Sequence, residues 1–224
     1  MITNLLDDYI DAFQYLKSYY KAEPMNVYFY MFVSSLFVLA AGLDSVEAAF
    51  SKDVLFMSDG QYGMLVSISG VGFLVGSILN TLIVESLTIR QLILLGGSMY
   101  MIGYLIVSTS FNFFSASIGF FLISFALAYI NTGFRTYIPF AFPINKIGQL
   151  TTAFNIMISL LEMMIVALVS IAGSIIQLRF VLIGIELIMV LIFFFIIHYS
   201  KKLKIDLMSE RKEEIEIFDG VKLD

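Results

Sequence analysis

The sequence contains no cysteine and only one histidine. Without cysteine, disulfide bonds, thiolate metal sites and cysteine nucleophiles are all excluded. His198 cannot build a histidine metal cluster by itself, so no metal site and no other cofactor is expected. Charged residues are also scarce: they make up 14% of the chain, whereas an average soluble domain has about a quarter.

Apolar residues are correspondingly abundant in the sequence. The chain has 224 residues, of which 59% are hydrophobic, and its mean hydropathy is +0.92. The apolar runs are about 20 residues long, enough for a helix rising ~1.5 Å per residue to cross the ~30 Å hydrocarbon layer. They lack the alternation of membrane barrels. We therefore predict an all-α membrane bundle with six transmembrane helices, at residues 27–50, 62–84, 92–111, 116–138, 150–176 and 178–198.

The two ends of the chain are more polar than its middle, which suggests three parts. Residues 1–25 show no cleavable signal peptide, but they carry an apolar stripe typical of an amphipathic helix on a membrane surface: Leu6, Tyr9, Phe13, Leu16 and Tyr20. An ordinary polar tail with helical bias is the alternative. Residues 26–200 form the six-helix domain, and residues 201–224 form a charged tail.

Two carboxylates lie at the end of the first predicted span. Asp44 and Glu47 are three residues apart, so they share one face if the helix runs on to Phe50. Acids in a spanning helix are costly and usually face protein or a water-filled cavity. We therefore expect both side chains to line a cavity for a proton or substrate, where they would attract cationic molecules.

The fifth predicted span has the most polar face in the bundle. Asn155, Ser159 and Glu162 recur at intervals of four and three, and Glu162 lies near mid-span. An acid at that depth suits a proton carrier, although a protonated glutamic acid could instead make only a helix-to-helix hydrogen bond. Asn131 in the fourth span is either a cavity residue or an interhelical hydrogen bond.

Small residues predict where helices pack closely. Ser69, Gly72 and Gly76 lie on one stripe of the second span, and the two glycines form a GxxxG pattern that lets backbones approach in lipid. The third span carries no charge, and we expect it to be peripheral. Pro139 and Pro143 are expected to break the helix after the fourth span. In the sixth span, Glu186 faces either the bundle or a separate partner.

Basic residues predict the orientation in the membrane. With six alternating spans and a cytoplasmic N-terminus, 11 of the 13 lysines and arginines fall on the inside. Only Lys52 and Arg179 fall outside. The positive-inside rule counts these residues rather than net charge, so both termini are expected in the cytoplasm of a multi-pass plasma-membrane protein.

Several segments resemble the second half of a major facilitator superfamily transporter, closest to the macrolide-efflux-like drug exporters. They are the run Leu43 to Phe50, then Asp53 to Leu55, then Tyr62-Gly63 opening the glycine-rich second span. The 135–148 loop with its prolines and the amphipathic helix before the first span resemble a later loop and the central linker of that family. The resemblance implies two inverted three-helix repeats and proton-coupled export of amphipathic small molecules.

A single six-helix half implies a partner, because alternating access needs a second half to rock against. That half would be a separate chain or a second copy, and nucleic acid is not an expected partner. The alternatives are a truncated remnant of a twelve-helix transporter or a non-transporting membrane partner or assembly subunit. An enzyme is not expected: His198 lies at the membrane edge, and Asp44 is the only aspartate within a span.

Overall fold

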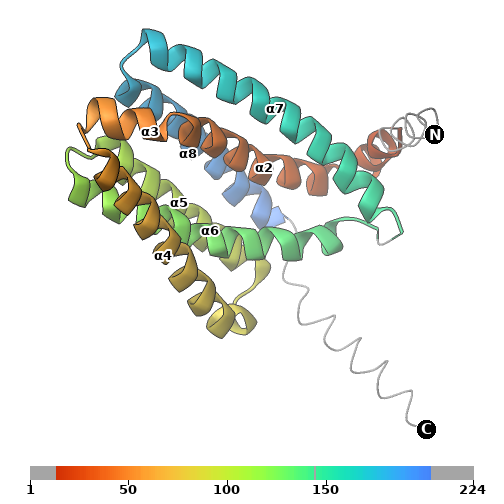
Figure 1. Ribbon diagram of the computed structural model, residues 1–224. Helices are drawn as coiled ribbons and strands as arrows, with labels where there is room; N and C mark the ends of the chain where they lie inside the picture. Colours follow the sequence, from red (N-terminus) through yellow and green to blue (C-terminus); the bar gives the residue numbers. More distant parts are fainter. Residues whose placement is uncertain (1–13, 144, 203–224) are drawn as a thin grey trace, which may run out of the picture.

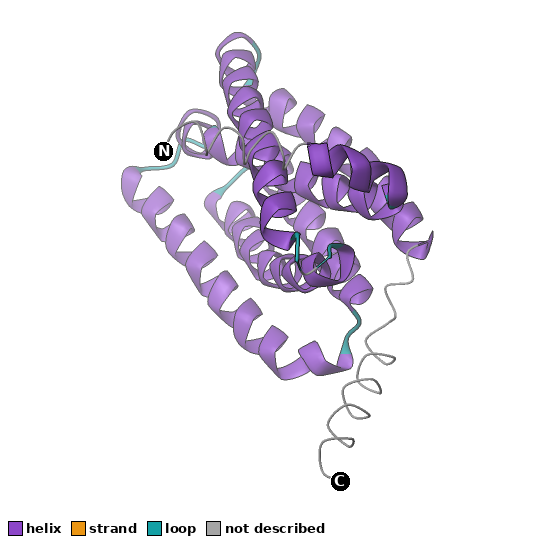
Figure 2. Cartoon of the chain, turned by 90° about the vertical axis from the view of Figure 1, so that its right-hand side faces the viewer, coloured by secondary structure: helices purple, strands orange, loops and turns teal. Residues whose placement is uncertain are grey.

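The computed structural model describes residues 14–143 and 145–202, and these form a helical bundle (Figures 1 and 2). Six helices in this part of the chain are long and apolar enough to cross a membrane. The prediction of an all-α protein with six such helices is confirmed. Their bounds are α2 (Pro24–Ser45), α4 (Asp59–Ile83), α5 (Ile89–Thr109), α6 (Phe113–Ala141), α7 (Ile147–Ile175) and α8 (Leu178–Lys202).

Polar caps set the starts of three helices. At α4, the Ser58 hydroxyl accepts from the Gln61 backbone N–H at 3.3 Å, and the Gln61 side chain accepts from the Ser58 N–H at 2.9 Å. Thr88 and Gln91 repeat this reciprocal capping box at α5. The Asn112 side chain caps α6. Such caps satisfy backbone donors that would otherwise have no partner, so very short turns can join these helices.

The first spanning helix is shorter than predicted. It ends at Ser45, is followed by the three-residue helix α3 (Glu47–Ala49), and continues as a π-helical turn, η1 (Phe50–Val54). The prediction of one helix running to Phe50 was therefore wrong. Val46 leaves the helical region with φ of −111° and ψ of 4°, and the Ser45 hydroxyl donates to the Gly42 carbonyl at 2.7 Å. That side-chain bond competes with the helical pattern and favours an end there.

Pro139 does not break α6, contrary to the prediction. The helix continues through it to Ala141. A proline has a φ close to the helical value and removes one backbone donor. The helix therefore gives up one backbone hydrogen bond at Pro139 and ends two residues later, at Ala141.

The helices pack as two groups. In one, α6 packs against both α4 and α5; in the other, α2 packs against both α7 and α8, and α5 meets α8 between the groups (Figure 1). More than half of the apolar part of α5 is buried, so the expectation of a peripheral third span was wrong. A side chain at Gly96 or Gly103 would collide with α6, at Ile130 and Ile123 respectively. These glycines draw α5 into the bundle.

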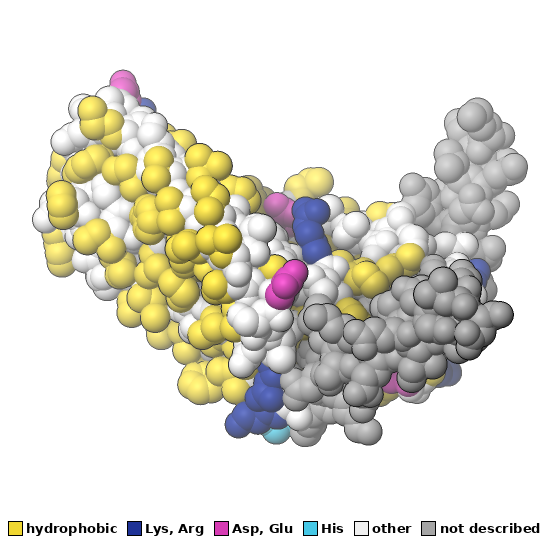
Figure 3. Space-filling model, turned by 90° about the horizontal axis from the view of Figure 1, so that it is seen from below, with side chains coloured by type: hydrophobic (Ala, Val, Ile, Leu, Met, Phe, Trp, Pro, Cys, Tyr) yellow, Lys and Arg dark blue, Asp and Glu magenta, His cyan; other side chains and the backbone are white. Residues whose placement is uncertain are grey.

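Helices α4 and α7 are the least covered, and much of their apolar surface lies on the outside of the bundle. Figure 3 shows apolar side chains spread over a broad area with few charges among them. This is the surface expected where lipid or another membrane helix replaces water.

The segment before α2 is helical over residues 14–22. Leu16 and Tyr19 are buried, whereas Tyr20 is 39% exposed, so the buried face is turned slightly from the predicted stripe. The Tyr19 ring packs against Phe142, and its hydroxyl donates to the Ala141 carbonyl. This helix therefore lies against the end of α6. The stripe residues Leu6, Tyr9 and Phe13 lie outside the described residues, as does most of the 201–224 tail.

Candidate functional site

A cavity of about 130 Å³ lies beside the last turn of α2, bounded by α4, α5, α6 and α8. At ~30 Å³ per water, it has room for about four water molecules. Its wall combines two carboxylates, two serines and several aromatic rings, and it contains no residue of α7. The lining residues are Leu43, Asp44, Glu47, Phe50, Ser69, Tyr100, Tyr104, Val107, Phe120, Ile123, Ser124, Leu127 and Leu182.

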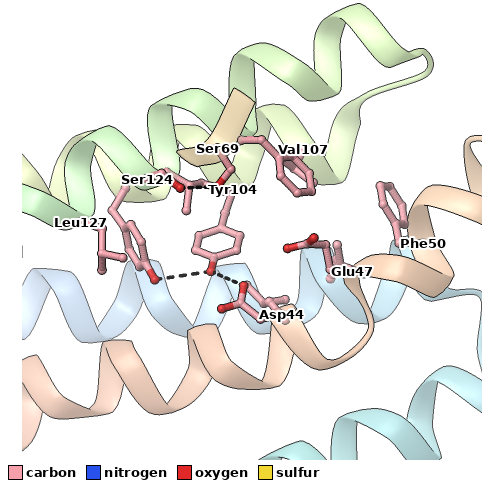
Figure 4. Close-up of a pocket in the computed structure, with 13 residues that line it drawn as sticks. Asp44, Glu47, Phe50, Ser69, Tyr104, Val107, Ser124 and Leu127 are labelled. Atoms are coloured by element: carbon pink, nitrogen blue, oxygen red, sulfur yellow. Dashed lines mark hydrogen bonds between the residues drawn. The ribbon is translucent and has the colours of Figure 1, made fainter. Parts of the chain in front are cut away.

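Asp44 occupies the last turn of α2, and its side chain is exposed to the cavity (Figure 4). Its Oδ1 accepts a hydrogen bond from the Tyr104 hydroxyl at 2.9 Å. Tyr104 comes from the second half of α5 and is almost fully buried. The Tyr100 hydroxyl, one turn earlier on α5, lies 3.4 Å from that of Tyr104. A short line of hydroxyls thus leads from α5 to the carboxylate.

Glu47 lies in α3, outside the six spanning helices, and is half-buried. Its Oε1 accepts from the Tyr62 hydroxyl of α4 at 3.0 Å. Burial raises the pKa of Glu47 to about 7; the Tyr62 hydrogen bond opposes this shift and the nearby charge of Asp44 adds to it. Glu47 can therefore gain or lose a proton near neutral pH. The end of α2 at Ser45 does not separate the two acids, since both line the same cavity.

The predicted packing stripe on α4 meets α6 along its length. Ser69 lines the cavity, and its hydroxyl lies 2.5 Å from that of Ser124 on α6 (Figure 4). Gly72 and Gly76 are buried farther along the stripe. A Cβ at Gly72 would lie 2.4 Å from the Phe121 carbonyl oxygen, so the two backbones touch directly. Ser69 thus contributes both to packing and to the cavity wall.

The nearest basic residues are engaged elsewhere. Lys52 forms an ion pair with Asp59 at 2.6 Å. Arg179 donates to the carbonyl oxygens of Ser108 and Ser110 at 2.9 and 2.7 Å. Within residues 14–143 and 145–202, neither acid of the cavity forms an ion pair. No ion pair with a described basic residue therefore balances these acids when they are ionised.

The polar face of α7 lies apart from this cavity. Asn155, Ser159 and Glu162 are exposed on the surface of the chain, and their side chains form no hydrogen bond with another described residue. The buried side of α7, which includes Phe154 and Val169, faces the bundle instead. This chain alone therefore brings Asp44 and Glu47 together but not Glu162. A cavity that includes Glu162 stays a prediction for an assembly that covers α7.

Asn131 is half-buried on α6, one turn beyond the cavity residue Leu127. It follows the same face of the helix but is not part of the lining. Its side chain makes no hydrogen bond to another residue of the described ranges, so the second alternative, an interhelical hydrogen bond, does not form among them.

Glu186 faces the bundle, which answers the question that the sequence left open. It is 5% exposed and accepts a hydrogen bond from the Ser108 hydroxyl at 2.8 Å. Arg179 binds the carbonyl oxygen of the same serine. Arg179 and Glu186 of α8 are thus connected through the end of α5 rather than by a direct ion pair.

The sequence interpretation missed the tyrosines. Tyr100 and Tyr104 lie in a span that was expected to be peripheral, and Tyr62 was read only as the start of the second span. The available signal was their spacing: Tyr100 and Tyr104 are four residues apart and share one helix face. A buried tyrosine hydroxyl usually needs a partner, so such a pair in an apolar helix indicates a polar neighbour.

The arrangement suits recognition of a cation. Carboxylate oxygens accept hydrogen bonds, and aromatic faces attract positive charge. The described residues contain no group of three or more His, Cys, Asp or Glu side chains placed to hold a metal ion. Comparisons with protein-family models, with curated proteins and with solved structures find no match to this chain.

Proposed function

We propose that this chain is a membrane transport protein: one six-helix half of a secondary transporter of the major facilitator type, which exports amphipathic small molecules in exchange for protons. The observation that carries the proposal is the cavity with Asp44 and Glu47, two acids without a balancing cation in a bundle of six apolar helices. Ionisable groups in such bundles commonly mark substrate or proton pathways.

The packing pattern supports a repeat. Helix α2 packs against α7 and α8 as α6 packs against α4 and α5. Exchanging α2 with α6, α4 with α7 and α5 with α8 reproduces these pairs, and the α5–α8 pair maps onto itself. Two inverted three-helix repeats related by a pseudo-twofold axis have this property.

In the proposed orientation both termini are cytoplasmic, the membrane is the plasma membrane, and the cavity lies toward the outer side. The distribution of basic residues supports it, because Lys52 and Arg179 are at the cavity end. The other basic residues in the described part of the chain are near the opposite ends of the helices: Lys17, Lys21, Arg90, Arg135, Lys146, Lys201 and Lys202. Substrate would thus meet Asp44 and Glu47 near the outer mouth.

A second six-helix half would complete the transporter, either as a separate chain or as a second copy. The exposed polar face of α7 supports this, because Glu162 would be costly against lipid and needs protein or water beside it. In the assembled transporter we assign Glu162 as the proton carrier and Asp44 as a group that attracts cationic substrate.

Flux measurements in proteoliposomes test the proposal, using the complex isolated from its native membrane and an imposed pH gradient. Glu162→Gln is expected to abolish gradient-dependent flux with folding intact, and Asp44→Asn is expected to weaken affinity for cationic substrates. Glu85→Gln, at the opposite end of α4, serves as the matched control. Wild-type flux in Glu162→Gln would make that glutamate a structural hydrogen-bonding group instead.

A non-transporting membrane partner or assembly subunit is the second candidate. One observation favours it: the cavity of about 130 Å³ is smaller than the ~300–1,000 Å³ of typical small-molecule sites. Absence of flux from the isolated complex with every cationic and neutral amphiphile offered would support this candidate over transport.

A further inference from the structure

We propose that a groove between α5 and α8 binds a single-chain amphiphile from the bilayer, with its primary ammonium head on Glu186 and its alkyl chain along the two helices. The groove has a volume of about 410 Å³, and its wall is apolar apart from Glu186 and Ser98. It shares no lining residue with the cavity beside Asp44. The site therefore does not depend on the proposed transport activity.

The groove is open on the outside of the bundle. Ile102 of α5 and Leu187 and Phe194 of α8 line it, and these side chains are 50–65% exposed. In a membrane-spanning bundle, an apolar surface of this kind meets hydrocarbon rather than water. A guest that is dissolved in the bilayer can therefore enter from the side.

Glu186 places an incompletely satisfied acceptor in this apolar wall. Its side chain lines the groove and is 5% exposed. Within residues 14–143 and 145–202, its hydrogen-bond donor is the Ser108 hydroxyl, which lies 2.8 Å from Oε2. The Leu105 carbonyl oxygen competes for the same proton at 3.1 Å. A carboxylate has about four acceptor sites, so Oε1 can accept an N–H from a guest.

The groups around Glu186 favour a cationic donor. A carboxylate that borders hydrocarbon is costly without a counter-ion, and no described basic residue forms an ion pair with Glu186. Arg179 instead donates to the Ser108 carbonyl oxygen at 2.9 Å. The Ser98 hydroxyl gives its proton to the Leu95 carbonyl oxygen at 2.9 Å, so it too can only accept. A primary ammonium supplies a positive charge and three N–H donors to a groove whose polar side chains are acceptors.

The dimensions of the groove fit one alkyl chain. Glu186 and Ile197, the last lining residue of α8, are 11 residues apart, or ~16 Å along the helix. An extended chain advances ~1.2 Å per bond, so about 14 bonds cover this length. If a methylene group takes the ~30 Å³ of a water molecule, the groove also holds about 14 of them. Length and volume thus agree on a single chain, and the second chain of a two-chain lipid would stay outside.

Fluorescence quenching of the full chain in nanodiscs of choline-headed lipid tests the site. The sequence has no tryptophan, so Phe194→Trp places a single indole in the groove. The probe is an undecylammonium ion with bromine, which quenches indole on contact, on its last carbon. Phe194 lies eight residues from Glu186, or ~12 Å, and the extended probe spans about the same distance. Leu160→Trp on α7 is the matched control, because Leu160 is 62% exposed and Phe194 is 65% exposed.

Quenching should saturate in Phe194→Trp and should rise linearly with probe content in Leu160→Trp. The head group should decide the affinity, because the alkyl chain only exchanges one hydrocarbon environment for another. Adding Glu186→Gln to Phe194→Trp should weaken saturable binding about tenfold or more, as for a lost charged hydrogen bond. Adding Ile102→Phe, which narrows the groove, should also weaken it. Adding Glu85→Gln, outside the groove, should leave it unchanged.

Four results would overturn the proposal. Linear quenching in both tryptophan variants would remove the groove as a site, as would the absence of quenching in Phe194→Trp because another protein helix covers it. Undiminished binding in Glu186→Gln with an unchanged circular dichroism spectrum would remove the role of the acid. If that variant does not fold, Phe194→Trp alone decides: the brominated undecanol or undecyltrimethylammonium must bind more weakly than the primary ammonium. Displacement of the probe by ethanolamine-headed lipid would assign the groove to a two-chain lipid instead.

Discussion

Replacing Gly72 by alanine should destabilise the bundle, because α4 and α6 touch through their backbones at this residue. The added Cβ would lie 2.4 Å from the Phe121 carbonyl oxygen and 3.0 Å from the Phe121 Cα. Real Cβ atoms essentially never come closer than 3.0 Å to such neighbours. The two helices would therefore have to separate by at least 0.6 Å, the difference between 3.0 and 2.4 Å. Backbone cannot rotate aside as a side chain can.

The magnitude follows from two opposing effects. Overpacking of this kind costs about 1–3 kcal/mol. Alanine gains about 1 kcal/mol over glycine in a helix. We expect a net loss of up to about 2 kcal/mol for Gly72→Ala. Gly76→Ala should behave in the same way, since its Cβ would lie 2.6 Å from the Phe125 carbonyl oxygen, and leucine at either position should cost more.

Gly70 offers a matched control on the same helix. A Cβ there would meet nothing within 4 Å, so Gly70→Ala should be neutral or stabilising by up to about 1 kcal/mol. Unfolding by sodium dodecyl sulfate, followed by far-ultraviolet circular dichroism, measures both variants. Opposite signs are expected. If Gly72→Ala is as stable as Gly70→Ala, the close contact between α4 and α6 does not exist.

Three further predictions concern topology, pH and the end of α5. Single cysteines at Lys52 and Asn112 should react with an impermeant reagent outside sealed cells, whereas one at Glu85 should not; labelling at Glu85 would contradict the orientation. Because Glu47 has a pKa raised from 4.5 to about 7, the folded chain binds a proton that the unfolded chain releases in this window. Stability should therefore fall as pH rises from 4.5 to 7, and in Glu47→Gln this contribution should vanish; identical unfolding profiles of the two proteins at pH 5 and 7.5 would argue against the shift. Arg179→Met should cost roughly 1.5–3 kcal/mol by removing charged hydrogen bonds to carbonyl groups, with partial recovery in Arg179→Lys, and unchanged unfolding would contradict this role.

The sequence was sufficient to find the six helices and the two acids of the cavity. Apolar runs of spanning length are a strong signal because lipid demands them. Asp44 and Glu47 stand out for the opposite reason, since charge is rare in such runs. The break between them could not be predicted, because neither glycine nor proline marks Val46 and the end depends on a side-chain bond from Ser45.

The position of a residue around its helix axis was harder to predict than its depth. Counting residues gives the height of Glu162 in α7, but the direction in which it points depends on how α7 is turned against α2. The same limit hid Tyr104, whose hydroxyl reaches Asp44 across 60 residues of sequence. Hydrophobicity along the sequence indicates how deep a residue lies in the membrane. A contact such as that between Tyr104 and Asp44 depends in addition on how the helices pack against one another.

The Arg179 contacts affect how the bundle can move. The guanidinium group ties α8 to the last carbonyl groups of α5, while three residues join α5 to α6 and two join α7 to α8 at the same end. Helices held so closely at one end cannot slide along one another there. Any rearrangement that opens the bundle must then proceed by tilting about this end, with the largest displacements at the opposite ends of the helices. The cavity beside Asp44 lies close to the fixed end, so its volume would change less than the spacing of the helices at the far side.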